Sequence, residues 1–328
     1  MTTRIPPLRR RAFLRLAAGA ATLPALARAA AAPDFPTRTV RIVCGFVAGQ
    51  IPDVAARLFA QALSARLGQQ FIVDNRPGAA TNLATEMVAR ADPDGYTLLV
   101  LTSSNATNAT LYTTLKFDLI RDFAPVATTF RSSLVLEINP AVPAKTTPEF
   151  IAYAKANPGK INFASPGVGT LPHVAGELFK GMTGVDIVHV PYRNAYLPDL
   201  LAGQVQAAFS PISTSLDFIA QGKLRALGVT SAQRADVLRD VPAIAEVLPG
   251  YAAYIWDAIA APKDTPADVV ATLNREINAV LADPAIRGRL TALGAEPLVM
   301  SPQQSAAFVA DETAKWGKVI HDAGIKAE

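Results

Sequence analysis

The feature that most constrains the fold is a regular alternation of strand-like and helix-like segments between Val40 and Val229. The strand-like segments are short apolar runs, and the segments between them repeat apolar residues with the helical period. We expect strands at residues 40–46, 70–73, 96–101, 126–138, 161–164, 187–190, 205–209, 224–229 and 254–261. We expect helices at residues 52–67, 82–91, 148–156, 266–282, 284–293 and 302–321, and another after Thr170. The alternation predicts a parallel, doubly wound α/β architecture.

Two of the expected strands divide the chain into two parts. At 328 residues the chain is long enough for two domains. The extended segments 126–138 and 254–261 are interpreted as crossings between them. They place residues 33–128 together with 258–328 in a first domain and residues 129–257 in a second.

The N-terminal residues 1–32 have the order of regions of an export signal. Arg10-Arg-Ala-Phe-Leu-Arg15 fits the twin-arginine pattern, and an alanine-rich apolar run follows at residues 16–26. That run is too short to span a bilayer, and small residues after it supply cleavage sites. A basic N-terminal tail is the alternative interpretation. We therefore expect a mature protein that begins near residues 30–33 and is located in the periplasm.

The positive net charge lies entirely within this signal. The chain carries a formal charge of +4, but residues 1–32 contain six arginines and no acidic residue. The remainder has 25 basic and 27 acidic residues, a formal charge of −2, so no electrostatic argument for nucleic-acid binding is left. The single cysteine, Cys44, cannot form an internal disulfide and lies within an expected strand. We interpret it as a buried structural thiol.

The segment Ser165-Pro-Gly-Val-Gly-Thr-Leu-Pro-His173 links an expected strand to an expected helix. Thr170 suits the N-cap position, and Pro172 falls in the first turn, where a missing N–H has no cost. Gly167 and Gly169 let the backbone approach a ligand. Free N–H groups and the hydroxyls of Ser165 and Thr170 favour an anion at this helix start. A glycine-rich turn without a ligand is the alternative.

Two further loops follow strands in the same way. The loop at residues 45–53 contains the candidates Phe46, Gly49 and Gln50, and Asp53 begins the next helix. We expect Asp53 to cap that helix rather than to contact a ligand, and Phe46 either to wall a pocket or to join the core. The second loop is a polar turn that could recognise a ligand or simply be solvated, because ligands of open α/β sheets bind beyond the carboxyl ends of strands. It comprises Thr102, Ser103, Ser104 and Asn105.

Enzyme signatures are absent from the sequence. There is no G-x-S-x-G, P-loop, H-E-x-x-H or complete G-x-G-x-x-G motif. The three histidines, at positions 173, 189 and 321, lack the spacing of metal ligands. His189 is expected to be a satisfied core residue, and His173 to support its loop or contact the ligand. We therefore predict no catalysis, no metal and no cofactor.

Short motifs along nearly the whole chain match one family in order. They are Phe35-Pro-Thr-Arg-Thr-Val-Arg-Ile-Val, the loop at 46–53, Asp74-Asn-Arg-Pro-Gly-Ala79, Ala91-Asp-Pro-Asp-Gly-Tyr-Thr-Leu-Leu99, Asp122-Phe-Ala-Pro-Val126, Ser165–His173 with Ala175-Gly-Glu-Leu-Phe179, Val188-His-Val-Pro-Tyr192, Leu200-Leu-Ala-Gly-Gln-Val205 and Gly222-Lys-Leu-Arg-Ala-Leu227. From Phe35 onwards the chain resembles the Bug-type periplasmic solute-binding proteins, the extracytoplasmic receptors of tripartite tricarboxylate transporters.

The resemblance implies two α/β domains that close, like a Venus flytrap, over one small carboxylate ligand. In the family, the loops matching 46–53 and 165–170 grip one carboxylate without an arginine. More variable residues read the far end of the ligand, and they correspond here to the regions of Thr102–Asn105, Tyr192 to Tyr196 with Asn194, Ser210 and Asp257. The implied protein is a monomer with membrane transporter subunits as partners.

Three positions depart from the family pattern. Gln50 stands where a glycine is common, Pro52 where a threonine is common, and Ser210 where an aspartate is frequent. Because losing the aspartate would weaken recognition of an ammonium group, although Asp257 could replace it, we expect a mono- or dicarboxylic acid, aromatic acids included, rather than an amino acid. The leading hypothesis is a transport receptor. The alternatives are a ligand-loaded sensor for a membrane signalling protein and, less favoured, an exported enzyme acting on a carboxylate.

Overall fold

The computed structural model describes residue 2, residues 35–193 and residues 195–327. The predicted export signal, apart from residue 2, and the candidate ligand contact Asn194 lie outside the described residues.

A single mixed sheet organises residues 36–328. Its strands lie in the order β2 (Phe71–Asn75), β1 (Val40–Cys44), β3 (Thr97–Thr102), β9 (Tyr254–Pro262), β4 (Phe123–Ile138), β7 (Ala207–Pro211), β5 (Asn162–Ser165) and β6 (Val188–Pro191). Two further strands, β8 (Arg225–Val229) and β10 (Glu296–Pro297), pair with β4. The helices are α1 (Ile51–Leu67), α2 (Asn82–Ala89), α3 (Ser103–Leu111), α4 (Thr147–Ala156), α5 (Leu171–Thr183), α6 (Leu197–Leu201), α7 (Ile212–Ala220), α8 (Ala267–Ala282), α9 (Pro284–Ala292) and α10 (Pro302–Asp322).

Two parallel groups of strands flank a pair of long antiparallel strands. In the β1 group, β1 pairs in parallel with β2 and β3, and in the β5 group, β5 pairs in parallel with β6 and β7. Between the groups, β9 and β4 run antiparallel to each other and to their neighbours β3 and β7. The predicted α/β fold class is confirmed, and the parallel order that the alternation predicts holds within each group.

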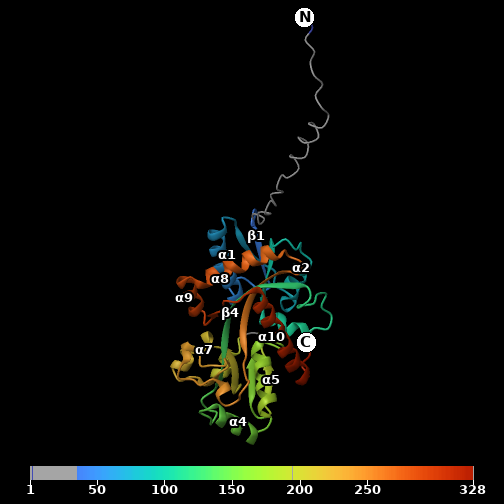
Figure 1. The fold of residues 1–328 in the computed structure, drawn as a ribbon. Helices are drawn as coiled ribbons and strands as arrows, with labels where there is room; N and C mark the ends of the chain where they lie inside the picture. Colours follow the sequence, from blue (N-terminus) through green and yellow to red (C-terminus); the bar gives the residue numbers. More distant parts are fainter. Residues whose placement is uncertain (1, 3–34, 194, 328) are drawn as a thin grey trace. The chain divides into compact units, whose positions relative to one another are not determined.

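The strand β4 connects the two groups, the β5 group directly through β7 and the β1 group through β9. Its residues 123–133 pair with β9, whereas its residues 134–138 pair with β7 and β8. Figure 1 shows β4 running from the elements around β1 and α1 to those around α4 and α5. The sequence predicts this strand as the extended segment 126–138, and the structure extends it by three residues at its start.

Local signals in the sequence explain where the helices begin and end. Pro52 lies in the first turn of α1, where no N–H is needed, and Gly68 ends the helix with a left-handed backbone, φ 67°. The helix α5 buries its apolar stripe, including Val174 and Phe179, under the β5 group. Within the described residues, no helix is both long and apolar enough to cross a membrane.

The C-terminal helix α10 returns to the β1 group and is tied there by a buried carboxylate. Glu312, 7% exposed, accepts hydrogen bonds from the indole N–H of Trp256 at 3.1 Å and of Trp316 at 2.9 Å. Both tryptophans are fully buried. This contact joins α10 to the long strand β9.

We expect Glu312→Leu to lower the free energy of unfolding by about 2–4 kcal/mol, because two buried indole N–H groups lose a charged acceptor. Glu312→Gln keeps an acceptor and should lose less than half as much. Urea unfolding followed by tryptophan fluorescence measures both values. Equal stability of the leucine variant and the unchanged protein would show that the contact does not hold α10 in place.

Candidate functional site

A cavity of about 410 Å³ lies between the β1 group and the β5 group. The β1 group contributes residues after β1 and β3, the β5 group contributes residues after β5 and β7, and the β4–β9 pair contributes the remaining wall. The lining residues are Phe46, Gly49, Gln50, Ile51, Pro52, Thr102, Ser103, Ser104, Phe130, Ser132, Thr170, Leu171, Pro172, Pro211, Ser213, Ile255 and Asp257.

Four helices begin at this cavity. The first residues of α1, α3 and α5 line it, and so do the N-cap and second residue of α7. The first-turn N–H groups of a helix have no partner within the helix, and they carry the positive end of its dipole. Helix starts that converge on one cavity therefore make it favourable for negative charge.

Three of these helix starts, those of α1, α5 and α7, are left open by their own side chains. In α1, α5 and α7 no N-cap side chain accepts a hydrogen bond from the first turn. In α3, Thr102 and Asn105 form a capping box, in which the Thr102 side chain accepts from the backbone N–H of Asn105 and the Asn105 side chain accepts from the backbone N–H of Thr102 at 2.8 Å. Away from the cavity, α4, α9 and α10 are each capped by a side chain. The open first turns can therefore donate to a ligand.

Among the described residues, no lysine, arginine or histidine lines the cavity, and the single ionisable residue in its wall is acidic, Asp257. An anion held here would be bound by neutral donors and dipoles rather than by a cation. Apolar side chains at Phe46, Phe130 and Ile255 supply the remaining contact surface.

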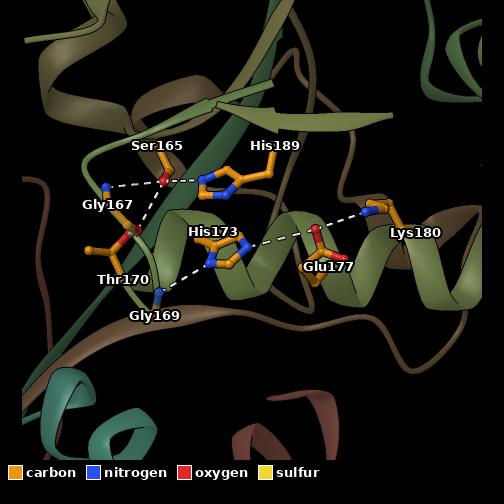
Figure 2. Close-up of polar contacts among 8 residues, drawn as sticks. All are labelled: Ser165, Gly167, Gly169, Thr170, His173, Glu177, Lys180 and His189. Atoms are coloured by element: carbon orange, nitrogen blue, oxygen red, sulfur yellow. Dashed lines mark hydrogen bonds and ion pairs between the residues drawn. The ribbon is translucent and has the colours of Figure 1, made fainter. Parts of the chain in front are cut away.

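The loop between β5 and α5 is held by its own hydrogen bonds (Figure 2). Ser165 Oγ lies 2.6 Å from His189 Nε2, 3.1 Å from the Gly167 carbonyl and 3.2 Å from the Gly167 N–H. Thr170 Oγ1 donates to the Gly167 carbonyl at 2.7 Å. Ser165 is fully buried and does not line the cavity, whereas Thr170 does. Ser165 therefore positions the loop, and Thr170 carries the hydroxyl of this loop that lines the cavity.

Two stacked imidazole rings lie beneath this loop. The rings of His173 and His189 are 3.6 Å apart and nearly parallel. His173 Nδ1 accepts the N–H of Gly169 at 3.1 Å, which places the ring proton on Nε2, 3.7 Å from Glu177. Glu177 is itself bonded by Lys180 at 2.9 Å. His173 is thus a support of the loop, and His189, interpreted from the sequence as a core residue, is a partner of Ser165.

Burial keeps both rings neutral. It lowers the pKa of His173 to about 3, with further lowering by His189 and Lys180. It lowers the pKa of His189 to about 4, again with a contribution from Lys180. A neutral His173 is needed here, because Nδ1 can accept the Gly169 N–H only when it carries no proton.

Gly169 is required by backbone conformation and by space. Its φ of 76° lies in the left-handed region, and a Cβ there would stand 2.3 Å from Leu111 Cδ2. Leu111 is the last residue of α3. The loop of the β5 group therefore touches a helix of the β1 group through a residue without a side chain.

The loop between β1 and α1 is held by a charged network behind the cavity. Asp53, 2% exposed, accepts the Gly49 N–H at 2.8 Å, the Arg57 Nε at 3.0 Å and the Asn75 amide at 2.8 Å. Burial alone would raise the pKa of Asp53, but the hydrogen bonds from Arg57, Gly49 and Asn75 outweigh it and hold the pKa below its usual value. Asn75 also donates to the Phe46 carbonyl at 3.0 Å. Asp53 fixes the loop and does not line the cavity.

The residues after β3 form a helix rather than the turn predicted from the sequence. Ser103 is the first residue of α3, and the polar composition of this helix hides it from propensity arguments. Its first turn is tied to residues 79–81, which all have positive φ, through Asn105 to Thr81 at 3.2 Å and Asn108 to the Ala80 carbonyl at 2.6 Å. Left-handed backbone at non-glycine residues costs about 1–3 kcal/mol each. The buried amides hold this strained segment next to the cavity.

The candidates at the far end of the ligand differ in their positions. Asp257 lines the cavity, whereas Ser210 and Tyr192 do not. Ser210 is fully buried, accepts from Tyr196 at 2.8 Å and bonds Glu137. Tyr192 donates to Asp199 at 2.7 Å. Burial, partly offset by hydrogen bonds from Ser210 and Ser215, raises the pKa of Glu137 to about 7.

The structure brings half of the sequence-predicted site residues to the cavity wall. These are Phe46, Gly49, Gln50, Thr102, Ser103, Ser104, Thr170 and Asp257. Others lie behind the wall or away from it: Asp53, Ser165, Gly167, Gly169, His173, Tyr192 and Ser210. Lining residues that the sequence did not single out as ligand contacts are Ile51, Pro52, Phe130, Ser132, Leu171, Pro172, Pro211, Ser213 and Ile255. The start of α7, after a strand and Pro211, carries the same strand-to-helix signal as the predicted loops.

A second cavity, of about 470 Å³, lies on the other face of the β4–β9 pair. Arg131 and Tyr254 line it, whereas their neighbours Ser132 and Ile255 face the first cavity, as the alternation of a strand requires. Arg131 is paired with Glu296 at 2.9 Å. The first cavity, where the four helix starts meet, is the candidate binding site.

Comparison with known proteins fits this geometry. Residues 55–325 match the model of the tripartite tricarboxylate transporter family receptor. The chain belongs to this receptor family. Its Bug-type relatives include the protein BugT of Bordetella pertussis, 35% identical over 92% of this chain and 94% of that protein.

Solved structures of similar receptors contain carboxylic acids. One is the Rhodopseudomonas palustris protein Rpa4515 with adipate, 37% identical with a TM-score of 0.76, covering 89% of this chain and 99% of that one. Another is MatC from Rhodopseudomonas palustris with bound malate, 32% identical with a TM-score of 0.72, covering 87% of this chain and 100% of that one. The receptor therefore shares both its sequence family and its fold with carboxylate-binding proteins.

The neutral histidine stack predicts a loss of stability in acid. Because both rings have a pKa below the value of about 6.5 of an unfolded histidine, the unfolded chain takes up protons that the folded receptor does not, and stability falls as the pH drops below about 6.5. The unfolded His173→Phe variant takes up one proton fewer, because phenylalanine does not titrate. The stability difference between the receptor and this variant should therefore shrink by about 1.4 kcal/mol per pH unit between pH 6 and pH 4.

Urea unfolding at half-unit pH steps measures the free energy of unfolding of the receptor and of the variant. Taking the difference between the two cancels the contributions of all unchanged groups. The matched control is His321→Phe, since the side chain of His321 is 87% exposed. A difference for His173→Phe that is as flat with pH as the control would contradict the neutral stack.

Proposed function

We propose that this chain is a periplasmic receptor that captures a small carboxylate by closing around it and delivers it to a membrane transporter of the tripartite tricarboxylate type. The observation that carries the proposal is the meeting of four helix starts, three of them uncapped, at one cavity to which no described residue contributes a cation. Such a site favours an anion with several acceptor positions, and a carboxylate has about four.

Preorganised donors make neutral binding of an anion effective. Hydrogen bonds to charged groups are worth about 1.5–3 kcal/mol each, and closure of the cavity would exclude water that weakens them. In α1 the first turn offers the N–H groups of Ile51 and Asp53, because Pro52 has none. In α5 it offers those of Leu171 and His173, because Pro172 has none. The Asp53 and His173 networks hold both loops in place before the ligand arrives.

We infer that residues 33–128 with 258–328 and residues 129–257 are the two lobes that close. The crossings between them would be β4 and β9, and closure would bring the start of α5 towards the start of α1. The contact of Gly169 with Leu111 supports this motion, since it already joins the two sides.

The size of the cavity and the residues that line it indicate the class of ligand. A cavity of about 410 Å³ suits a small molecule. Apolar contacts from Phe46, Phe130 and Ile255 suit a short carbon chain or an aromatic ring. The adipate and malate in similar receptors support a mono- or dicarboxylic acid for this chain.

The proposal is tested by purifying the receptor natively, releasing the bound molecule by heat and identifying it by mass spectrometry. A carboxylic acid that rebinds unchanged supports a receptor. Conversion of that acid to a product would support the enzyme alternative, and the absence of any carboxylic acid ligand would contradict the site. Uptake assays with reconstituted transporter subunits, set beside binding assays with membrane sensors, separate transport from sensing.

We expect Ile51→Pro to weaken carboxylate binding by about 10- to 100-fold, because it deletes one charge-assisted N–H donor. Gln50 is already extended, φ −75° and ψ 159°, as the residue before a proline should be, and proline is well accepted at the first helical position. Ile51→Val is the matched control, which shortens the side chain and keeps the N–H. Calorimetry with the identified acid compares the two variants, and equal affinities would remove the start of α1 from the binding site.

A further inference from the structure

The cavity wall contains a buried carboxyl group that has no hydrogen-bond partner among the described residues. Asp257 is 3% exposed, lines the cavity, and neither of its side-chain oxygens has a hydrogen-bond partner within the described residues. It lies on β9 between Thr102 of β3 and Phe130 of β4. A buried polar group without a partner is costly, so this side chain needs either a proton or a donor from outside the protein.

Three hydroxyl groups on the neighbouring strands do not bond the Asp257 side chain. The Thr102 hydroxyl bonds the Asn105 side chain at 3.0 Å, and the Thr129 hydroxyl donates at 3.0 Å to the backbone carbonyl of Asp257, not to its side chain. Ser132 on the cavity wall donates to the Gly294 carbonyl. The protein therefore leaves both oxygens of Asp257 to be satisfied by a ligand.

No cation of the described residues compensates the charge of Asp257. Neither β3 nor α3 carries a titratable side chain. On β4, Arg131 is paired with Glu296 and faces the opposite cavity. On β1 the buried thiol of Cys44 interacts electrostatically with Asp257, and in α1 the charges of Asp53 and Arg57 neutralise each other.

Burial raises the pKa of Asp257 to about 8. At neutral pH the empty site therefore holds Asp257 mainly as the uncharged acid. A protonated acid still leaves one oxygen as an unsatisfied acceptor. A ligand donor supplies what is missing in either protonation state.

We propose that Asp257 contacts a hydrogen-bond donor on the ligand, so that the natural ligand is a hydroxy acid or an amino acid rather than an unsubstituted carboxylic acid. The inference rests on the proposed function, because the helix starts must hold the ligand carboxylate for its donor to reach Asp257. The assignment also locates the residue that discriminates among carboxylates. Ser210, at the position where the family frequently has an aspartate, does not line this cavity.

A hydroxyl donor and an ammonium donor differ in whether their binding releases a proton. A hydroxyl bonds Asp257 in either protonation state, so its binding needs no proton exchange. An ammonium group pairs with the carboxylate, so its binding releases the proton of Asp257. The affinity for an amino acid should therefore rise by up to tenfold per pH unit between pH 6 and pH 8, whereas that for a hydroxy acid should change by less than about threefold.

The experiment measures affinities by calorimetry for matched sets of probes. The sets are succinate, malate and aspartate; glutarate, 2-hydroxyglutarate and glutamate; and benzoate with 3-hydroxybenzoate. In at least one set, the hydroxy or amino member should bind at least tenfold more tightly than the unsubstituted acid. Titrations at pH 6, 7 and 8 then identify the kind of donor.

The variant Asp257→Leu should reduce this preference to less than about threefold. Removing an unpartnered buried carboxyl should also raise the melting temperature, so loss of the fold does not obscure the result. Asp257→Asn, which keeps one acceptor, should retain part of the preference for the hydroxy acid and lose the pH dependence for the amino acid.

Equal or tighter binding of the unsubstituted acids would overturn this inference and leave the proposed function standing. A preference for the hydroxy or amino member that persists in Asp257→Leu would have the same two consequences. Binding of no member of any set would count against the carboxylate receptor itself, and the inference would fail with it.

Discussion

The antiparallel pairing of β4 with β9 is the constraint on which the rest of the structure depends. These two strands lie between the two groups of parallel strands, with β9 paired to β3 and β4 paired to β7, so they set how the helix starts of one group face those of the other. In each parallel group the carboxyl ends of the strands, and hence the helix starts that follow them, lie at one edge. The central pair turns these two edges towards each other across one cavity. A site built from helix starts is a consequence of this topology.

The same topology explains why polar residues near the cavity have two different roles. Some side chains form hydrogen bonds that hold the loops and lie behind the cavity wall, namely those of Ser165, His173 and Asp53. The backbone of these loops is then presented to the cavity, with Gly49 and Thr170 in the wall. Side chains hold the backbone in position, and the backbone supplies the donors. Asp257 is the exception, because it lies in the wall and has no partner within the described residues.

Much of the fold could be predicted because its signals are local. Gly68 ends α1 and Pro52 begins it, and the apolar period of α5 can be read directly from the sequence. The direction of β9 could not be read, because pairing between strands far apart in the chain leaves no local pattern. The start of α3 was also missed, since its serines, threonines and asparagines are stabilised as a helix by tertiary contacts. For the site, the strand-to-helix loops identified the region, but only the structure separates Thr170 in the wall from Ser165 behind it.

The absence of a cation from the described part of the cavity wall has a consequence for how fast a ligand is captured. The field of a helix start fades within about one turn, so it cannot attract an anion over a long distance. Residues 33–328 carry a formal charge of −2, which provides no attraction either. Electrostatic steering is therefore weak, and the association rate should depend little on ionic strength. Selection of carboxylates then takes place after entry, through the lifetime of the closed complex.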